Sequence, residues 1–105
     1  MNKIQEQQGK ITYQILNDFY SCLDSSIKNY SVYYKNGESL IDIITIIPRD
    51  DEETETKIYS FEAKILNKYS NKIDIDFHLM PKYQEPLKDC VPQNFKRYVP
   101  KLATS

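Results

Sequence analysis

The segment Lys72–Pro81 places three side chains that could do chemistry on one face of a single strand. Polar and apolar residues alternate along it, so Asp74, Asp76 and His78 point one way and the apolar side chains between them point the other way. Such alternation is typical of a half-buried β-strand. Carboxylates and an imidazole can bind a cation, exchange protons or contact a partner. This polar row is therefore the main candidate site.

The composition of the chain indicates one folded domain. Of its 105 residues, 40% are hydrophobic and 28% are charged, which suits a globular protein with a modest core. The formal net charge is −1, whereas domains that bind nucleic acid usually carry a basic excess, so nucleic acid is not the expected partner. No apolar run is long enough to span a membrane, and residues 1–8 lack the apolar stretch of a signal peptide. We therefore expect a cytoplasmic protein without a membrane segment.

Two helices are expected to support the candidate site. Apolar residues recur at spacings of three and four from Lys10 to Ile27, which predicts an amphipathic helix, and the polar residues 1–9 are expected to fray. A second helix should begin within Asp50–Glu53, because this run supplies an N-cap and the early acidic residues that suit the N-terminus of a helix. Its buried stripe consists of Ile58, Phe61, Ile65 and Tyr69.

The dipeptide Asn36-Gly37 predicts a β-hairpin. It lies between two strand-like runs, Tyr30–Lys35 and Leu40–Ile47, and both of its residues readily adopt the positive φ of a type I′ turn. A two-residue loop at this position would pair Tyr33 with Leu40. The second run is apolar on both faces, which is typical of a central strand.

The predicted element order is α-β-β-α-β within a single domain over residues 1–105. We expect an α/β (α+β) two-layer sandwich in which a right-handed crossover helix joins the second strand to the third. The Pro-rich segment 81–105 should form an irregular C-terminal arm, with a short edge strand within Phe95–Val99. Both helices should then cover one face of the sheet and leave the other face open.

Alternation along the strands assigns the candidate binding residues to this open face. They are Tyr33, Ile44, Ile46, Asp74, Asp76 and His78. An exposed aliphatic patch in a small domain usually binds a partner, forms a dimer interface or is covered by another part of the chain. Ile44 and Ile46 would be the apolar anchors of such a patch, and the arm after Pro81 is a candidate cover.

The aspartates of the open face could alternatively bind a divalent metal ion. Hard cations such as Mg²⁺ prefer oxygen ligands, and carboxylates on neighbouring strands can converge on one ion. The candidate ligands are Asp42, Asp74 and Asp76. In the same interpretation His78 is the candidate general base, because the ordinary pKa of histidine lies near neutral pH.

The acidic strands also carry a family resemblance. The stretches Leu40–Thr45 and Ile73–Asp76, with the element order from Ile11 to Leu79, resemble the minimal nucleotidyltransferase fold. That resemblance implies a Mg²⁺-dependent transferase. The family pattern has a Gly-Ser turn and a second acid two residues further along the middle strand, where this chain has Asn36-Gly37 and Ile44. The element order also resembles small RNA-binding KH-like domains, whose Gly-x-x-Gly loop this chain lacks.

Two functions follow from these patterns. The first is a small non-enzymatic module that binds another protein, or a second copy of itself, through its open sheet face and needs no cofactor. The alternative is a degenerate nucleotidyltransferase-like enzyme that depends on Mg²⁺.

Overall fold

The structure is a computed structural model that describes residues 3–48, 51–81 and 92–100, with side chains described from Gly9 onward. Its elements are, in chain order, α1 (Lys3–Asp24), β1 (Ser31–Asn36), β2 (Leu40–Ile47), α2 (Glu52–Tyr69), β3 (Asp74–Pro81) and β4 (Lys96–Tyr98). The strands form one sheet in the order β3-β2-β1-β4, with β2 parallel to β3 and the other neighbours antiparallel. The protein is thus a small α+β domain with a mixed four-stranded sheet.

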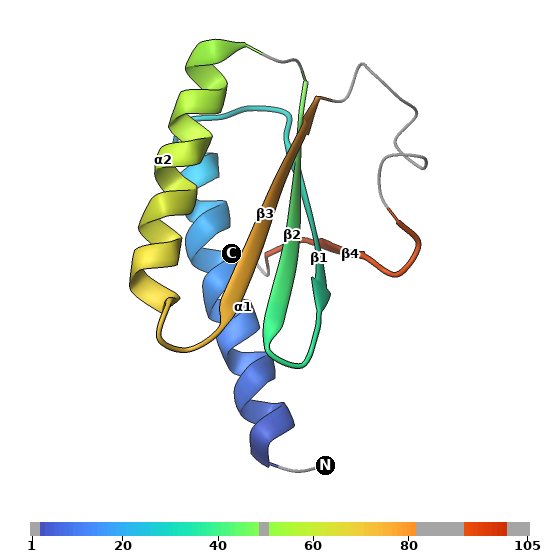
Figure 1. The fold of residues 1–105 in the computed structure, drawn as a ribbon. Coiled ribbons are helices and arrows are strands. Elements are labelled where there is room, and N and C mark those ends of the chain that lie inside the picture. The colour runs from blue at the N-terminus through green and yellow to red at the C-terminus, as the bar shows by residue number, and fades with distance from the viewer. Residues whose placement is uncertain (1–2, 49–50, 82–91, 101–105) are drawn as a thin grey trace.

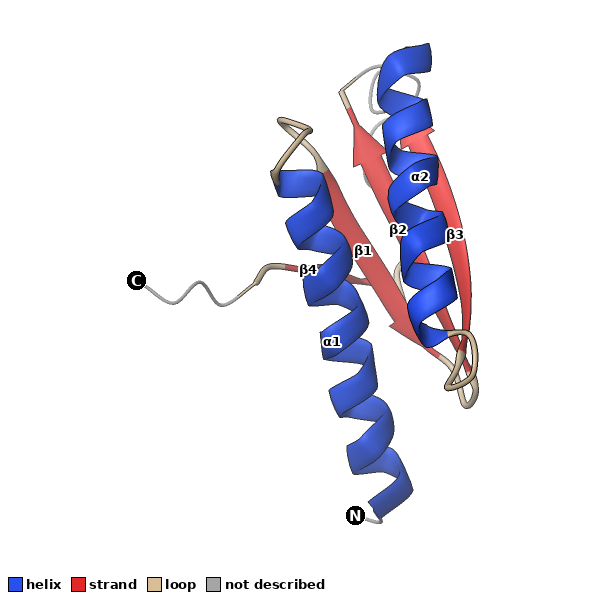
Figure 2. Ribbon diagram, turned by 90° about the vertical axis from the view of Figure 1, so that its left-hand side faces the viewer, coloured by secondary structure: helices blue, strands red, loops and turns tan. Residues whose placement is uncertain are grey.

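Both helices lie on the same side of the sheet (Figure 1). In Figure 2, α1 lies over β1 and β4, and α2 lies over β2 and β3. The core between helices and sheet is apolar and is built from both layers. Its most deeply buried members are Ile15, Leu16, Phe19, Leu23, Val32, Ile41, Ile43, Ile47 and Ile58. The face of the sheet that points away from the helices is called the open face below.

Hydrogen bonds between side chains also connect the two helices. The Lys68 Nζ and the Tyr69 hydroxyl both donate to Oδ2 of Asp18, at 2.8 and 2.5 Å. Burial by itself would raise the pKa of Asp18, but the two hydrogen bonds outweigh burial and hold this pKa below its ordinary value. The Asp18 carboxylate therefore stays ionised and links α1 to the last turn of α2.

The first helix is longer at its start than predicted. It begins at Lys3 and continues through Gly9, so the segment expected to fray is helical from Lys3 onward. One glycine costs a helix only about 1 kcal/mol relative to alanine, and the remaining turns outweigh that cost. The helix ends at Asp24, before the predicted limit, and Asn29 then turns the chain with a φ of 59°.

The hairpin turn was predicted at the wrong residues. Tyr33 pairs with Ile44 instead of Leu40, and the turn is closed by the Gly37 N–H, which donates to the Leu40 carbonyl at 2.7 Å. Asn29 is the only non-glycine residue with positive φ in the described part of the chain, and neither described glycine has one, so the turn is not type I′. The observed register pairs the apolar end of β2 with β1, whereas the predicted register would have left that end paired with β3 alone.

Two other strand predictions are confirmed. The apolar strand β2 lies inside the sheet between β3 and β1, as its apolar residues on both faces indicated. The short edge strand β4 falls within Phe95–Val99 and pairs with β1. The residues 82–91 and 101–105 of the predicted arm lie outside the described residues.

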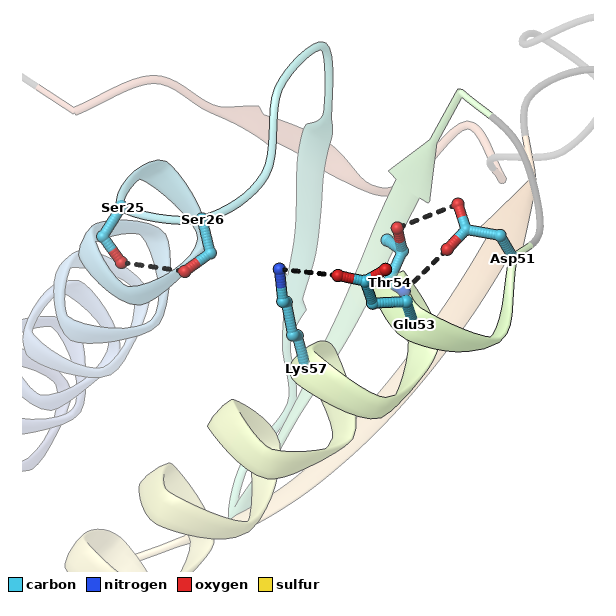
Figure 3. A network of polar contacts seen from close by, with 6 residues as sticks. All are labelled: Ser25, Ser26, Asp51, Glu53, Thr54 and Lys57. Atoms are coloured by element: carbon cyan, nitrogen blue, oxygen red, sulfur yellow. Dashed lines mark hydrogen bonds and ion pairs between the residues drawn. The ribbon is translucent and has the colours of Figure 1, made fainter.

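Asp51 caps the N-terminus of α2, which confirms the expected N-cap within Asp50–Glu53. Its Oδ1 accepts a hydrogen bond from the Thr54 backbone N–H at 2.8 Å, and its Oδ2 accepts one from the Thr54 hydroxyl at 3.0 Å (Figure 3). One turn further on, the Lys57 ammonium and the Glu53 carboxylate pair at 3.5 Å. The cap satisfies a backbone donor that has no partner within the helix.

Replacing Asp51 with Ala is expected to lower the free energy of unfolding by about 1 kcal/mol, because the Thr54 N–H loses its acceptor. Denaturant unfolding followed by circular dichroism measures this loss. Asp51→Asn is the matched control, since it keeps an accepting oxygen and should lose much less. Equal losses in the two variants would show that the negative charge, and not the capping hydrogen bond, stabilises this end of α2.

Candidate functional site

The parallel pairing of β2 with β3 brings the candidate residues of these two strands together. Asp42 lies directly opposite Asp76, and Ile44 lies opposite His78. Residues paired across two strands point to the same face of the sheet, so all four side chains belong to the open face. Asp74 is paired with Leu40 at the start of β3. The prediction that the aspartates and the histidine share one face agrees with this register.

Asp42, Asp76 and His78 form a cluster on the open face, called the Asp-Asp-His cluster below. One potential ligand atom from each side chain lies within 4.8 Å of the other two. The closest pair is Nε2 of His78 and Oδ1 of Asp42, at 3.5 Å. The Asp42 side chain is 19% exposed and the His78 side chain 48% exposed, so a ligand can reach the cluster from solvent.

The composition of this cluster differs by one residue from the predicted metal site. Asp42 and Asp76 were predicted as ligands and lie together, but the third member is His78 and not Asp74. Asp74 lies at the start of β3, where its backbone N–H donates to the Ser39 carbonyl at 3.1 Å. Two carboxylates with one imidazole suit Zn²⁺ or Mn²⁺ better than Mg²⁺, which prefers oxygen ligands only.

Ile44 and Ile46 are buried, although they lie on the open face. Their exposed fractions are only 3% and 2%, and neither belongs to the main core cluster. Ile44 and Ile46 are therefore not the exposed apolar anchors that were expected, and the alternative that the arm after Pro81 covers them lies largely outside the described residues. One physical reason for their burial is that β2 is an interior strand, so Ile44 lies between the larger side chains of Tyr33 and His78 on its two neighbours.

Two cations lie on this face, and only one of them, Lys35, could be assigned to it from the sequence. Arg97 of β4 pairs with Tyr33 and so shares the open face. Lys35 of β1 also points to this face, and its Nζ lies 5.6 Å from the centre of the Phe95 ring. The open face is thus acidic along β3 and basic towards β4, with the half-buried Tyr33 between the two ends. Lys96-Arg97 was visible in the sequence, but only the pairing of β4 assigns one of them to this face.

A separate groove lies between α1 and β4. It is lined by Tyr13, Gln14, Asn17, Tyr98 and Val99. Tyr13 is 59% exposed and Val99 is 68% exposed. The groove is far from the Asp-Asp-His cluster in the fold, because α1 covers the opposite face of the sheet (Figure 2). Its lining offers mainly hydrogen-bonding and aromatic groups, without a cluster of carboxylates or imidazoles.

Comparisons of the chain with protein-family models, curated proteins and solved structures gave no match. Among the described residues, no helix combines the length and the apolar character needed to cross a membrane. The function must therefore be inferred from the chemistry of the open face.

Proposed function

We propose that this protein is a small non-enzymatic module that binds another protein through the open face of its sheet. The observation that carries the proposal is the arrangement of charge on that face. The Asp-Asp-His cluster lies at one end, Arg97 lies at the other end, and Tyr33 lies between them. Tyrosine and arginine are both enriched in protein interfaces, where an aromatic ring provides rigid contact area.

The buried state of Ile44 and Ile46 defines the kind of partner that fits. Because these side chains are only 3% and 2% exposed, they offer no apolar anchor. Recognition would depend on charge and on the Tyr33 ring. A complementary partner would present a basic group to the Asp-Asp-His cluster and an acidic group to Arg97.

Affinity capture from a cell extract with four variants tests this proposal. Asp76→Lys and Tyr33→Ala alter the open face, and both are expected to release the proteins that the wild type retains. Tyr59→Ala, at a 53% exposed position on α2, is the matched control and should retain them. Arg97→Glu should release the same proteins as Asp76→Lys. Proteins retained by all open-face variants but released by Tyr59→Ala would contradict the proposal.

A divalent metal site at the Asp-Asp-His cluster is the second candidate function, and the convergence of three potential ligands favours it. With a bound ion and a nucleotide, such a site would be the degenerate transferase that the sequence resemblance implies. The position two residues after Asp42, where that family has another acid, is occupied by buried Ile44. Because Ile44 stands where the family pattern has an acidic residue, the metal site is the second candidate function and not the first.

Amide NMR titrations with Zn²⁺, Mn²⁺, Mg²⁺ and Mg²⁺-ATP separate the two candidates. If the cluster binds metal, the amides around Asp42, Asp76 and His78 shift or broaden, and Asp42→Asn abolishes the effect. Asp74→Asn is the matched control, since Asp74 lies outside the cluster and its loss should leave binding intact. An unchanged spectrum at millimolar metal would reject the metal site and leave the protein-binding proposal standing.

A further inference from the structure

The outer edge of β3 has no partner strand among the described residues. β3 is the first strand in the sheet order β3-β2-β1-β4, and it is eight residues long. Its pairing with β2 is continuous from Asp74 to Pro81, without a bulge that would twist the edge away. Figure 2 shows β3 at the right-hand margin of the sheet with no described element beside it. Proteins usually protect such edges by shortening, bulging or covering them.

The backbone groups that β3 presents at this edge can be identified from its bonds to β2. The Asp74 N–H donates to the Ser39 carbonyl, so Asp74 directs its backbone groups towards β2. In a ladder, successive residues alternate between the two sides of the strand. Ile75, Phe77 and Leu79 therefore direct their N–H and C=O groups outward. Pro81 has no N–H, so the row of outward donors ends at Leu79.

We propose that β3 pairs antiparallel with β3 of a second copy, about a two-fold axis at Phe77. This pairing places Phe77 opposite Phe77 of the partner subunit and Ile75 opposite Leu79 of the partner subunit. All outward N–H and C=O groups of Ile75, Phe77 and Leu79 then bond across the interface. The two sheets become one continuous sheet. This inference does not rest on the open-face proposal, because it uses the edge of the sheet and its backbone.

Charge complementarity selects this register. With the axis at Phe77, Asp76 lies opposite His78 of the partner subunit. By symmetry, His78 lies opposite Asp76 of the partner subunit on the other side of the axis. An imidazole can donate a hydrogen bond to a carboxylate in either of its protonation states. Moving the axis by one residue would place Asp76 opposite Asp76, or His78 opposite His78, and like groups directly opposite each other destabilise a sheet.

The apolar side of the strand fits the same arrangement. Ile75 is buried, but Phe77 and Leu79 are only half-buried where they contact the core. In the paired form these side chains meet their counterparts from the second copy on the helix side of the sheet. Apolar area that one copy leaves exposed would then be removed from water. Because only two strand edges meet, the interface is small, and we expect a Kd of roughly 10 µM to 1 mM.

Sedimentation and NMR diffusion of the full chain, from about 10 µM to about 1 mM, test the association. His78→Asp places carboxylates opposite carboxylates and should weaken the dimer about tenfold or more. The double variant Asp76→Lys with His78→Asp restores opposite charges and should recover it. Lys10→Glu, an exposed charge change on α1, is the control and should leave the dimer unaffected. A wild type that stays monomeric at about 1 mM would overturn the proposal.

Amide hydrogen exchange at high and low protein concentration then locates the interface. The amides of Ile75, Phe77 and Leu79 should be protected in the dimer and should exchange faster on dilution or in His78→Asp. The amides of Asp76 and His78 bond to β2 and are the internal control, with protection at both concentrations. A dimer without concentration-dependent protection at these three outward amides would place its interface elsewhere and would reject this pairing.

Discussion

Replacing Phe19 with Ala is expected to lower the free energy of unfolding by about 3–5 kcal/mol. Phe19 has no exposed surface, and its ring centre lies 4.9 Å from that of Phe77 on β3 with 48° between the ring planes. The side chain thus joins α1 to the edge strand of the sheet. Truncation removes buried apolar area and leaves a cavity that the surrounding side chains fill only in part. For a domain of this size, that loss is a large share of the total stability.

Denaturant unfolding followed by circular dichroism measures the Phe19→Ala effect. Phe19→Leu keeps most of the volume and should cost less than half as much. Tyr59→Ala, at a 53% exposed position, should change the free energy of unfolding by less than about 0.5 kcal/mol. A loss below about 1 kcal/mol in Phe19→Ala would show that α1 does not pack on β3 in this way.

The second prediction is that the free energy of unfolding depends on pH through the carboxyl group of Glu62 on α2. Burial raises the pKa of Glu62 to about 7, and its Oε2 is buried without a hydrogen-bond partner in the described part of the chain. An unfolded chain would titrate this group near its ordinary value of about 4.3. Because the folded pKa is the higher one, folding favours the protonated form. The stability that this carboxyl contributes is complete below about pH 4 and is lost as the pH rises through about 7.

Glu62→Gln should therefore stabilise the protein at pH 8 by about 1 kcal/mol, a figure reduced for the solvent exposure of this side chain. At pH 4 the variant and the wild type should have nearly equal free energies of unfolding. Unfolding in urea at pH 4, 6 and 8 measures the difference. Glu52→Gln, an exposed change on the same helix, controls for net charge and should give no gain at pH 8. An equal gain at pH 4 and pH 8 would show that ionisation of Glu62 is not the cause.

The faces of the strands could be predicted although the hairpin register could not. The observed pairing of Tyr33 with Ile44 differs from the predicted pairing with Leu40 by an even number of residues. Since side chains alternate with a period of two, an even shift keeps every residue on its assigned face. Asp42 was therefore assigned to the same face as Tyr33 correctly, although the register was incorrect.

The membership of the candidate site could be predicted only in part. Alternation along β3 assigns Asp74, Asp76 and His78 equally to the open face. The offset between β2 and β3 decides which of them meets Asp42, and it depends on how α2 and its connections set one strand against the other. No local pattern in either strand encodes that offset. The register places Asp74 and His78 one pair to either side of Asp76, and it is the longer side chain of His78 whose Nε2 reaches Oδ1 of Asp42, at 3.5 Å.

What the sequence by itself determined about this protein is local: two amphipathic helices, a helix cap within Asp50–Glu53, the alternation of the strands and the central place of β2. These features follow from backbone periods of 3.6 and 2 residues, which act over a few neighbouring positions. Only the tertiary structure decided the hairpin register, the partner of β4, the burial of Ile44 and the make-up of the Asp-Asp-His cluster. Each of these depends on contacts between segments far apart in the chain, whose relative positions are set by packing of the whole core.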